Sequence, residues 1–158
     1  MRSALRNHRG KTALVLAGGG ATDDLEGAEV LTAIHEAANS DPDIHVLELP
    51  PTANIEINAI QRASTLVLQK SLKEGFGLTV SEALWKAKPV IAGAVGGIPL
   101  QVTHRYSGIL THTIEGTAFW IKQLLNAPEF AARLGRNRCS ASSGAQIARR
   151  QGKIAPAP

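Results

Sequence analysis

Short apolar runs recur along the chain, and glycine, proline or polar residues bound each of them. They are rich in valine, leucine and isoleucine and too short for helices, which is typical of strands. The run at 12–17, for example, stops at three consecutive glycines, and a Pro-Pro pair soon follows the run at 44–48. The pattern predicts five strands, at 12–17, 44–48, 65–69, 89–93 and 107–110.

Between these runs, apolar residues recur at the three- and four-residue spacing of helices. This spacing predicts helices at 25–39, 54–63, 78–87, 98–103, 114–125 and 128–134. Strands that alternate with helices of about ten residues form βαβ units. The expected fold class is therefore α/β, with a parallel sheet that helices cover on both faces.

The composition fits one globular domain. The 158 residues include 44% hydrophobic and 19% charged residues, which suits a single core and not a disordered chain. No apolar run approaches the ~18–20 residues of a membrane span, and the basic start lacks an apolar signal core. The single cysteine, Cys139, excludes a disulfide scaffold. We therefore expect a protein of the reducing cytoplasm, neither secreted nor embedded in a membrane.

The formal net charge of +4 is unevenly distributed. Residues 1–11 carry +4 and residues 133–158 carry +6, whereas residues 12–132 carry −6. The folded part is therefore not expected to present the basic face that nucleic-acid recognition requires. Apolar spacing also disappears towards the end of the chain, as in disordered segments. We expect a basic lead at 1–11, a domain at 12–135 and a disordered tail at 136–158.

Several familiar motifs are absent from the sequence. Gly18–Gly20 lacks the third glycine of a dinucleotide-binding fingerprint, because Asp23 occupies its place, and no P-loop follows. The five histidines form no ligand pair at helical spacing, so no metal site is expected. On a parallel sheet, the loops at the carboxyl ends of the strands are then the places where a ligand would bind.

The most informative of these loops leads into a helix, over residues 73–85, Lys-Glu-Gly-Phe-Gly-Leu-Thr-Val-Ser-Glu-Ala-Leu-Trp. Its glycines let the backbone approach a ligand closely. The first turn of the helix leaves amide groups unpaired and carries a positive dipole end, which suits a diphosphate. Glu82 is expected to project from that turn, where it could accept hydrogen bonds from sugar hydroxyls. Glu74, before the glycines, could meet a second polar group of the ligand.

Other interpretations of the two glutamates need no such ligand. Thr79 and Glu82 have the spacing of a capping box, which satisfies helix donors within the protein. Glu74 could be a solvated loop carboxylate. The two carboxylates could also form a glycosidase-like pair, which depends on their separation in space. The residues by themselves leave these alternatives open.

The same segment resembles a known enzyme family. Glu74 and Glu82 enclose Gly-Phe-Gly-Leu-Thr, then Glu-Ala-Leu-Trp-Lys-Ala-Lys-Pro-Val-Ile follows, and Val-Gly-Gly-Ile stands at 95–98. These motifs are similar to the C-terminal, donor-binding domain of retaining glycosyltransferases of family 4, which have the GT-B fold of two Rossmann-like domains. Over residues 12–135, the amino-acid sequence is similar to that of the trehalose synthase and trehalose phosphorylase branch of this family.

The resemblance implies a Rossmann-like parallel sheet and a nucleoside diphosphate glucose as the donor. It implies that glucose is transferred to glucose with retention, giving trehalose, and that no metal or other cofactor is needed. Glu74 would contact the transferred glucose as the catalytic residue, and Glu82 would bind the ribose of the nucleotide. The sugar and the diphosphate would be held by the loop and helix start, which comprise Gly75, Phe76, Gly77, Leu78 and Thr79.

The sequence also departs from the family pattern. The family's basic pair, which clamps the departing diphosphate, has no match ahead of this segment, although Arg9 or Lys11 could stand in. Thr65 stands where aspartate is usual in the family. The N-terminal acceptor-binding domain and the helix that closes the family's fold are not recognised, and the similarity fades after residue 137.

These departures leave several possibilities open. The chain is expected to be incomplete as an isolated enzyme, because an active site formed between two domains needs both to position the reactants. It could be a catalytically silent nucleotide-sugar-binding fragment, one half of a split enzyme, or the product of a truncation or shifted reading frame. Its expected partners are the donor, a missing acceptor domain, or a second copy through the same face. A module that binds protein or nucleic acid is the non-enzymatic alternative.

Overall fold

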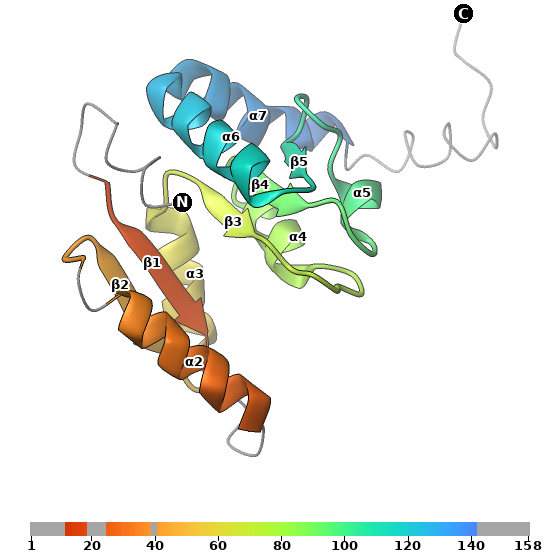
Figure 1. Ribbon diagram of the computed structural model, residues 1–158. Coiled ribbons are helices and arrows are strands. Elements are labelled where there is room, and N and C mark those ends of the chain that lie inside the picture. Colours follow the sequence, from red (N-terminus) through yellow and green to blue (C-terminus); the bar gives the residue numbers. More distant parts are fainter. Residues whose placement is uncertain (1–11, 19–24, 39–40, 142–158) are drawn as a thin grey trace, which may run out of the picture. The chain divides into compact units, whose positions relative to one another are not determined.

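A computed structural model of the chain describes residues 12–18, 25–38 and 41–141 (Figure 1). Strands and helices alternate along these residues, which confirms the predicted α/β class. Their order is β1 (Leu14–Gly18), α2 (Leu25–Ala38), β2 (Ile44–Glu48), α3 (Asn54–Ala63), β3 (Val67–Gln69), α4 (Leu78–Trp85), β4 (Val90–Gly93), α5 (Ile98–Gln101), β5 (Ile109–Thr111), α6 (Ile114–Asn126) and α7 (Pro128–Ala141).

The chain divides into two compact units, and the smaller one comprises residues 8–60. It contains β1, α2, β2 and the first part of α3. The two strands pair in parallel, from Leu14 opposite Ile44 to Gly18 opposite Glu48. A hydrogen bond of 2.9 Å between Nε2 of His35 and Oε1 of Glu48 joins α2 to the end of β2.

The larger unit includes the chain from Gln61 onwards and holds a parallel sheet of three strands in the order β3-β4-β5. Val67 lies opposite Val90, and Ile91 lies opposite Ile109. β4 is therefore the central strand, and all of its residues are buried. Its uninterrupted small and apolar sequence is typical of a strand that is covered on both faces.

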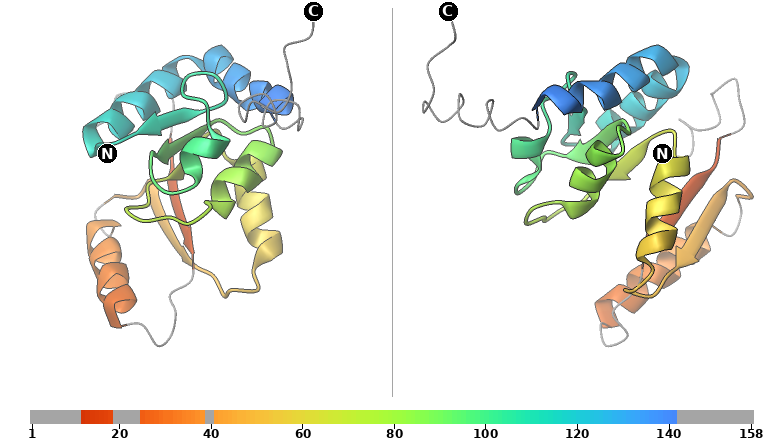
Figure 2. Two further views of the ribbon diagram at one scale, coloured as in Figure 1. Left: turned by 90° about the vertical axis from the view of Figure 1, so that its right-hand side faces the viewer. Right: turned by 180° about the vertical axis from the view of Figure 1, so that it is seen from behind.

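Helices cover both faces of this three-stranded sheet, with α4 on one side and α6 and α7 on the other (Figure 2). Because side chains alternate along a strand, successive residues of β4 enter different clusters. Val90 and Ala92 pack with the apolar residues of α4, whereas Ile91 packs with those of α6 and α7. The two packed layers hold the carboxyl ends of β3 and β4 side by side, and the loops that follow these ends form the candidate site.

The observed elements follow the predicted ones, with differences at their ends. α4 ends at Trp85, and α5 is a single turn within the predicted helix 98–103. α7 continues to Ala141, past the predicted domain boundary at residue 135. The expected basic lead at 1–11 and the rest of the predicted tail lie outside the described residues. Within the described ranges, no helix is both long and apolar enough to cross a membrane.

Candidate functional site

The loop between β3 and α4 is fastened by the carboxylate of Glu74. Oε1 accepts a hydrogen bond of 3.2 Å from the backbone N–H of Gly77. Oε2 accepts from Nε2 of Gln69 at 3.2 Å and from Oγ of Ser71 at 3.3 Å. Gln69 is the last residue of β3. The carboxylate of Glu74 therefore links the turn at residues 75–77, here called the glycine turn, to the end of that strand. Glu74 is half-buried and well partnered, and is not a freely solvated loop carboxylate.

A second loop, after β4, packs directly against this glycine turn. The N–H of Gly97 donates to the carbonyl oxygen of Gly75 at 2.7 Å. A Cβ at Gly96 would overlap the carbonyl oxygen of Glu74, and one at Gly97 would lie 2.8 Å from that of Gly75. Glycine is needed at 96 for its backbone conformation as well, because its φ is +55°. The two backbones therefore approach more closely than side chains would allow.

Gly77 turns the chain into α4. Its φ of +84° lies in the left-handed region, and its carbonyl oxygen accepts from the N–H groups of Val80 and Ser81. No side chain caps this helix end within the described part of the chain. The first N–H groups of the helix therefore point towards the loop. The positive end of the helix dipole lies at these same groups.

The capping box proposed for Thr79 and Glu82 is wrong. Because Gly77 already makes the turn, α4 begins at Leu78 and Thr79 lies inside the helix as its second residue. Glu82 is the fifth residue of α4, so it lies one turn into the helix and not in the first turn. Its carboxylate takes a different partner, because Oε2 accepts a hydrogen bond of 2.9 Å from Nε2 of Gln61 on α3.

Gln101 and Lys86 make further side-chain hydrogen bonds around the site. Gln101 of α5 donates through Nε2 to the carbonyl oxygen of Phe76, and its Oε1 accepts from Oγ of Ser81 on α4 at 2.5 Å. Lys86, just after α4, donates through Nζ to Oε1 of Gln61 at 2.6 Å. Three glutamines therefore each hold one part of the site. Gln61 of α3 bonds to Glu82, Gln69 of β3 bonds to Glu74, and Gln101 of α5 bonds to the glycine turn.

The structure brings the predicted site residues 74–79 together in one turn, which hydrogen bonds from Glu74 and from the loop after β4 hold in place. The side chains of Phe76 and Leu78 are 58% and 68% exposed, so the turn leaves apolar surface open to solvent. Among the described residues, the carboxylates of Glu74 and Glu82 have separate hydrogen-bond partners and share none.

Sequence reasoning missed the residues that hold the two glutamates and the turn between them, which are Gln61, Gln69, Ser71 and Gln101. Three of them carried a usable signal. Gln69 and Ser71 are polar residues at and just after the end of an apolar strand, where ligand sites of parallel sheets form. Gln61 lies four residues after the half-buried Ile57 on the same helix, and a polar residue on a buried helix face needs a partner.

Other candidate features contribute nothing to this site. No group of three or more histidine, cysteine, aspartate or glutamate side chains in the described ranges could hold a metal ion. A hollow in the smaller unit, between α2 and β2, contains none of the predicted site residues and is lined by Thr32, His35, Glu36, Ala38, Asp41, Pro42, Ile44 and Val46. Arg9, Lys11 and the loop at 19–24 lie outside the described residues.

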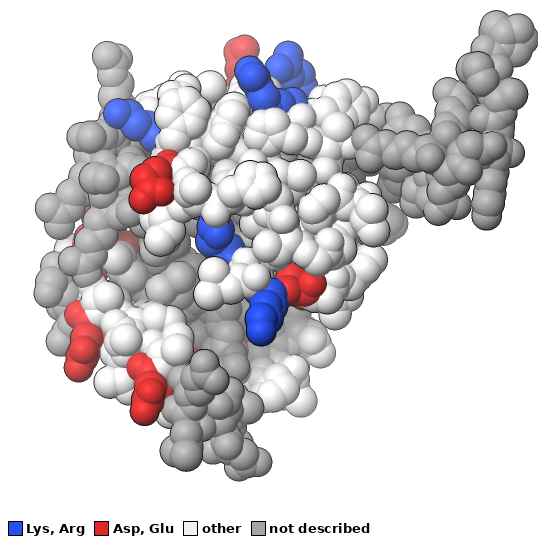
Figure 3. All heavy atoms as spheres, turned by 45° about the vertical axis from the view of Figure 1, so that its right-hand side comes forward, with Lys and Arg blue, Asp and Glu red and all other residues white. Residues whose placement is uncertain are grey.

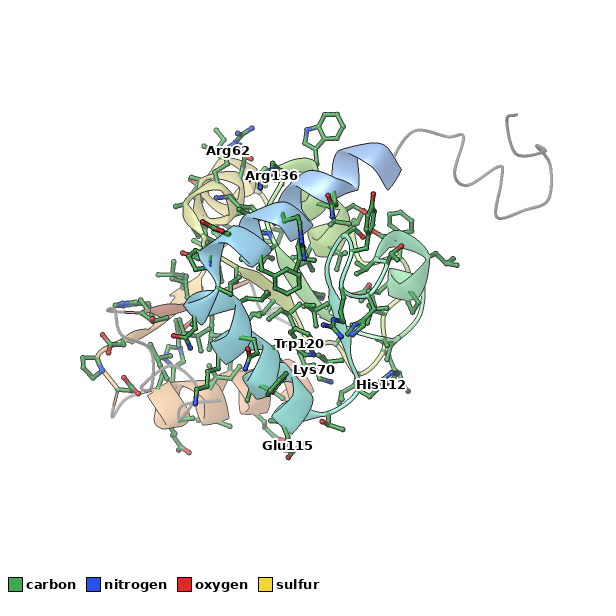
Figure 4. The ribbon with its side chains drawn as sticks, turned by 90° about the horizontal axis from the view of Figure 1, so that it is seen from above. Arg62, Lys70, His112, Glu115, Trp120 and Arg136 are labelled. Carbon is green, nitrogen blue, oxygen red and sulfur yellow. The ribbon has the colours of Figure 1, made fainter. Side chains whose placement is uncertain are left out.

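On the face drawn in Figure 3, lysines and arginines do not merge into a continuous basic stripe. Lys70 and His112 directly follow β3 and β5, so both stand at the edge where the strands end (Figure 4). Arg105 instead packs its guanidinium over the ring of Trp120, 5.6 Å from the ring centre.

Comparison with known proteins gives one family and a consistent set of relatives. The family described as "Glycosyl transferases group 1" matches residues 1–139. A trehalose synthase of Rubrobacter xylanophilus is 48% identical over 128 residues, which are 80% of this chain and 30% of that protein. A trehalose synthase of Thermococcus litoralis is 42% identical over 125 residues. A trehalose phosphorylase of Pleurotus pulmonarius is 45% identical over 104 residues, which are 62% of this chain and 14% of that protein.

Solved structures of glycosyltransferases share the fold. Anabaena Alr3699/HepE in complex with UDP-glucose is similar with a TM-score of 0.72 and 22% identity, covering 96% of this chain and 44% of that one. The C-terminal domain of LpcC from Francisella tularensis matches with a TM-score of 0.71 and 24% identity, covering 97% and 75%. These matches confirm the predicted Rossmann-like fold of a GT-B half. The chain spans about 30% of the length of the trehalose synthases that it matches.

Proposed function

The chain belongs to the group 1 family of glycosyl transferases, and we propose that it binds the nucleotide-sugar donor of a retaining, trehalose-forming glucosyltransferase. The relatives named trehalose synthase, at 42–48% identity over about four-fifths of this chain, support glucose as the transferred sugar and trehalose as the product. As an isolated polypeptide, the chain is expected to bind donor and to transfer glucose slowly or not at all.

The observation that carries the proposal is the glycine turn, which hydrogen bonds hold in place at the start of α4. The turn is held by Glu74 on one side and by the loop after β4 on the other. Fixed backbone N–H groups at a helix start stabilise a diphosphate, and they do so without rearranging when its negative charge grows during departure. The exposed faces of Phe76 and Leu78 leave this turn open to a ligand.

The two glutamates would contact the two ends of the donor. A carboxylate offers about four acceptor positions, and the protein occupies three of those of Glu74. The remaining one suits a hydroxyl of the transferred glucose. Glu82 has a single hydrogen bond from the described part of the protein, through Oε2, so Oε1 could accept from the ribose hydroxyls of the nucleotide.

In the proposed reaction, the bond between C1 of the donor glucose and the diphosphate oxygen breaks, and its electron pair leaves with the diphosphate. A hydroxyl oxygen of the acceptor glucose forms the new bond to C1 on the face that the diphosphate occupied, and the hydroxyl proton is released. The site's residues serve this step by positioning the donor and by stabilising the departing charge.

Calorimetric titration of the 158-residue chain tests the proposal. UDP-glucose and ADP-glucose are titrated separately, because the residues described here do not distinguish the bases, with glucose and trehalose as controls. We expect one donor to bind with a dissociation constant in the micromolar to low millimolar range, more tightly than either sugar. Absence of binding by a chain that circular dichroism shows to be folded would overturn the proposal.

Phosphorolysis of trehalose is the second candidate, because the Pleurotus trehalose phosphorylase is 45% identical over part of the chain. The same backbone N–H groups would then hold phosphate in place of a diphosphate. Titration with inorganic phosphate and glucose 1-phosphate separates the two functions. Binding of these compounds without binding of either nucleotide sugar would favour the phosphorylase.

A further inference from the structure

Gln61, a buried glutamine on α3, lies between two charged side chains. One is Glu82, within α4, and the other is Lys86, which directly follows that helix. Gln61 is only 6% exposed, and it is the buried residue of α3. Its Nε2 donates to Oε2 of Glu82 at 2.9 Å, and its Oε1 accepts from Nζ of Lys86 at 2.6 Å. The amide is therefore satisfied at both ends by groups that lie four residues apart in sequence.

The chemistry of the two neighbours fixes which way the amide faces. A lysine ammonium can only donate hydrogen bonds, and an ionised carboxylate can only accept them. The amide oxygen must therefore face Lys86 and the amide nitrogen must face Glu82. A rotation of the amide by half a turn would oppose two donors on one side and two acceptors on the other, which is costly for a buried group.

We propose that Gln61 is a positioning residue, which holds the carboxylate of Glu82 in the orientation that receives the ribose of the donor. The inference rests on the proposed function of Glu82. With Oε2 occupied by Gln61, the carboxylate presents Oε1, which has no protein partner within the described part of the chain. A glutamate on a helix surface otherwise samples several rotamers, and ordering it before the ligand arrives lowers the cost of binding.

A merely structural role would produce a different result. If Gln61 served only to join α3 to α4, its loss would lower the melting temperature and would affect all nucleotides alike. A positioning role through Glu82 instead predicts a loss that depends on the ribose hydroxyls. Discrimination between ribose and deoxyribose nucleotides is therefore the readout that separates the two roles.

The test compares the binding of UDP with that of 2′-deoxy-UDP and 3′-deoxy-UDP to the full chain, and repeats the comparison with the adenine nucleotides. We expect the wild type to prefer the ribose form by about tenfold or more, since a hydrogen bond to a charged group is at stake. Gln61→Met, which removes both amide groups at similar volume, is expected to abolish most of that preference. Gln123→Met, on the exposed surface of α6, is the matched control and should keep it.

A second substitution keeps the test decisive if Gln61→Met folds poorly. Gln61→Glu retains an acceptor for Lys86 but faces Glu82 with a like charge, so the ribose preference should again be lost. Where Gln61→Met does fold, adding Glu82→Gln to it should cause no further loss, because both substitutions act on the same contact. An unchanged ribose preference in the folded Gln61 variants would overturn the inference. Absence of nucleotide binding by the wild type would instead overturn the proposed function itself.

Discussion

Glu74 and Glu82 lie on the same short segment, yet the rest of the fold uses them differently. Glu74 accepts three hydrogen bonds from its own loop and strand, so it shapes the turn that would hold the diphosphate. Glu82 is exposed, and among the described residues its hydrogen-bond partner is Gln61. Substitutions at the two positions should therefore separate stability from ligand binding.

Glu82→Gln is expected to weaken donor binding about tenfold while leaving the melting temperature nearly unchanged. The amide oxygen can still accept from Gln61, but the charge that strengthens a hydrogen bond to the ribose is lost. Calorimetry and thermal unfolding of the same preparations measure the two effects, with Glu115→Gln on the exposed start of α6 as the control (Figure 4). Equal affinity in the Glu82 variant would return Glu82 to a purely structural role.

Glu74→Ala is expected to lower both stability and affinity. The substitution leaves the N–H of Gly77 without its side-chain acceptor, and the amide of Gln69 keeps only its hydrogen bond of 2.8 Å to Oγ of Ser71, which together should cost about 1–3 kcal/mol of unfolding free energy. Urea unfolding measures this loss. A variant with full stability would show that the three hydrogen bonds do not hold the turn.

At the scale of elements, the site depends on the contact between the loops after β3 and β4. Gly96→Ala should destabilise the chain by about 2–4 kcal/mol, because it adds a Cβ at a φ of +55° and against the carbonyl of Glu74. Gly75→Ala is the matched control, since its Cβ would meet no protein heavy atom within 4 Å. Urea unfolding of both variants checks the difference, and equal midpoints would contradict the packing described.

Gly75→Ala also tests whether the ligand approaches the backbone closely at this position. Apart from its chain neighbours, a methyl group at Gly75 would meet no heavy atom of the described residues within 4 Å, so a loss of donor affinity in Gly75→Ala at unchanged stability would come from the ligand side of the turn. We expect such a loss, because the backbone here is proposed to approach the sugar and diphosphate closely.

The elements were predictable from the sequence because their signals are local. Short apolar runs and helical spacing identified β4, α4 and α6, the glycine loop before α4 singled out Glu74 and Glu82, and the resemblance assigned a role to each. The contacts that hold those glutamates were not predictable in this way. Gln61 and Glu82 are 21 residues apart, and Phe76 and Gln101 are 25 apart, so only the tertiary fold of the larger unit brings each pair together. The capping box failed because spacing cannot show that Gly77 adopts the left-handed conformation.

At the scale of the whole molecule, apolar burial is concentrated in the larger unit. Of the buried apolar residues in the described part of the chain, only Ala38 and Ala53 belong to residues 8–60, and the fully buried isoleucines belong to β4, α5, β5 and α6. Local opening is easiest where few apolar contacts must break. Hydrogen exchange should therefore be slowest in β4 and β5 and markedly faster in β1 and β2. Equal protection of all four strands would contradict this distribution of burial.

The central claim is that the glycine turn and the start of α4 bind the donor, and amide chemical shifts test it most directly. Two-dimensional ¹H–¹⁵N spectra of the labelled chain would be recorded while UDP-glucose or ADP-glucose is added. The account predicts that the largest shifts occur at Gly75, Gly77, Leu78, Thr79 and Glu82, with a further shift at Gly97 through its bond to Gly75. Shifts confined to the hollow between α2 and β2, around His35 and Ile44, would contradict it.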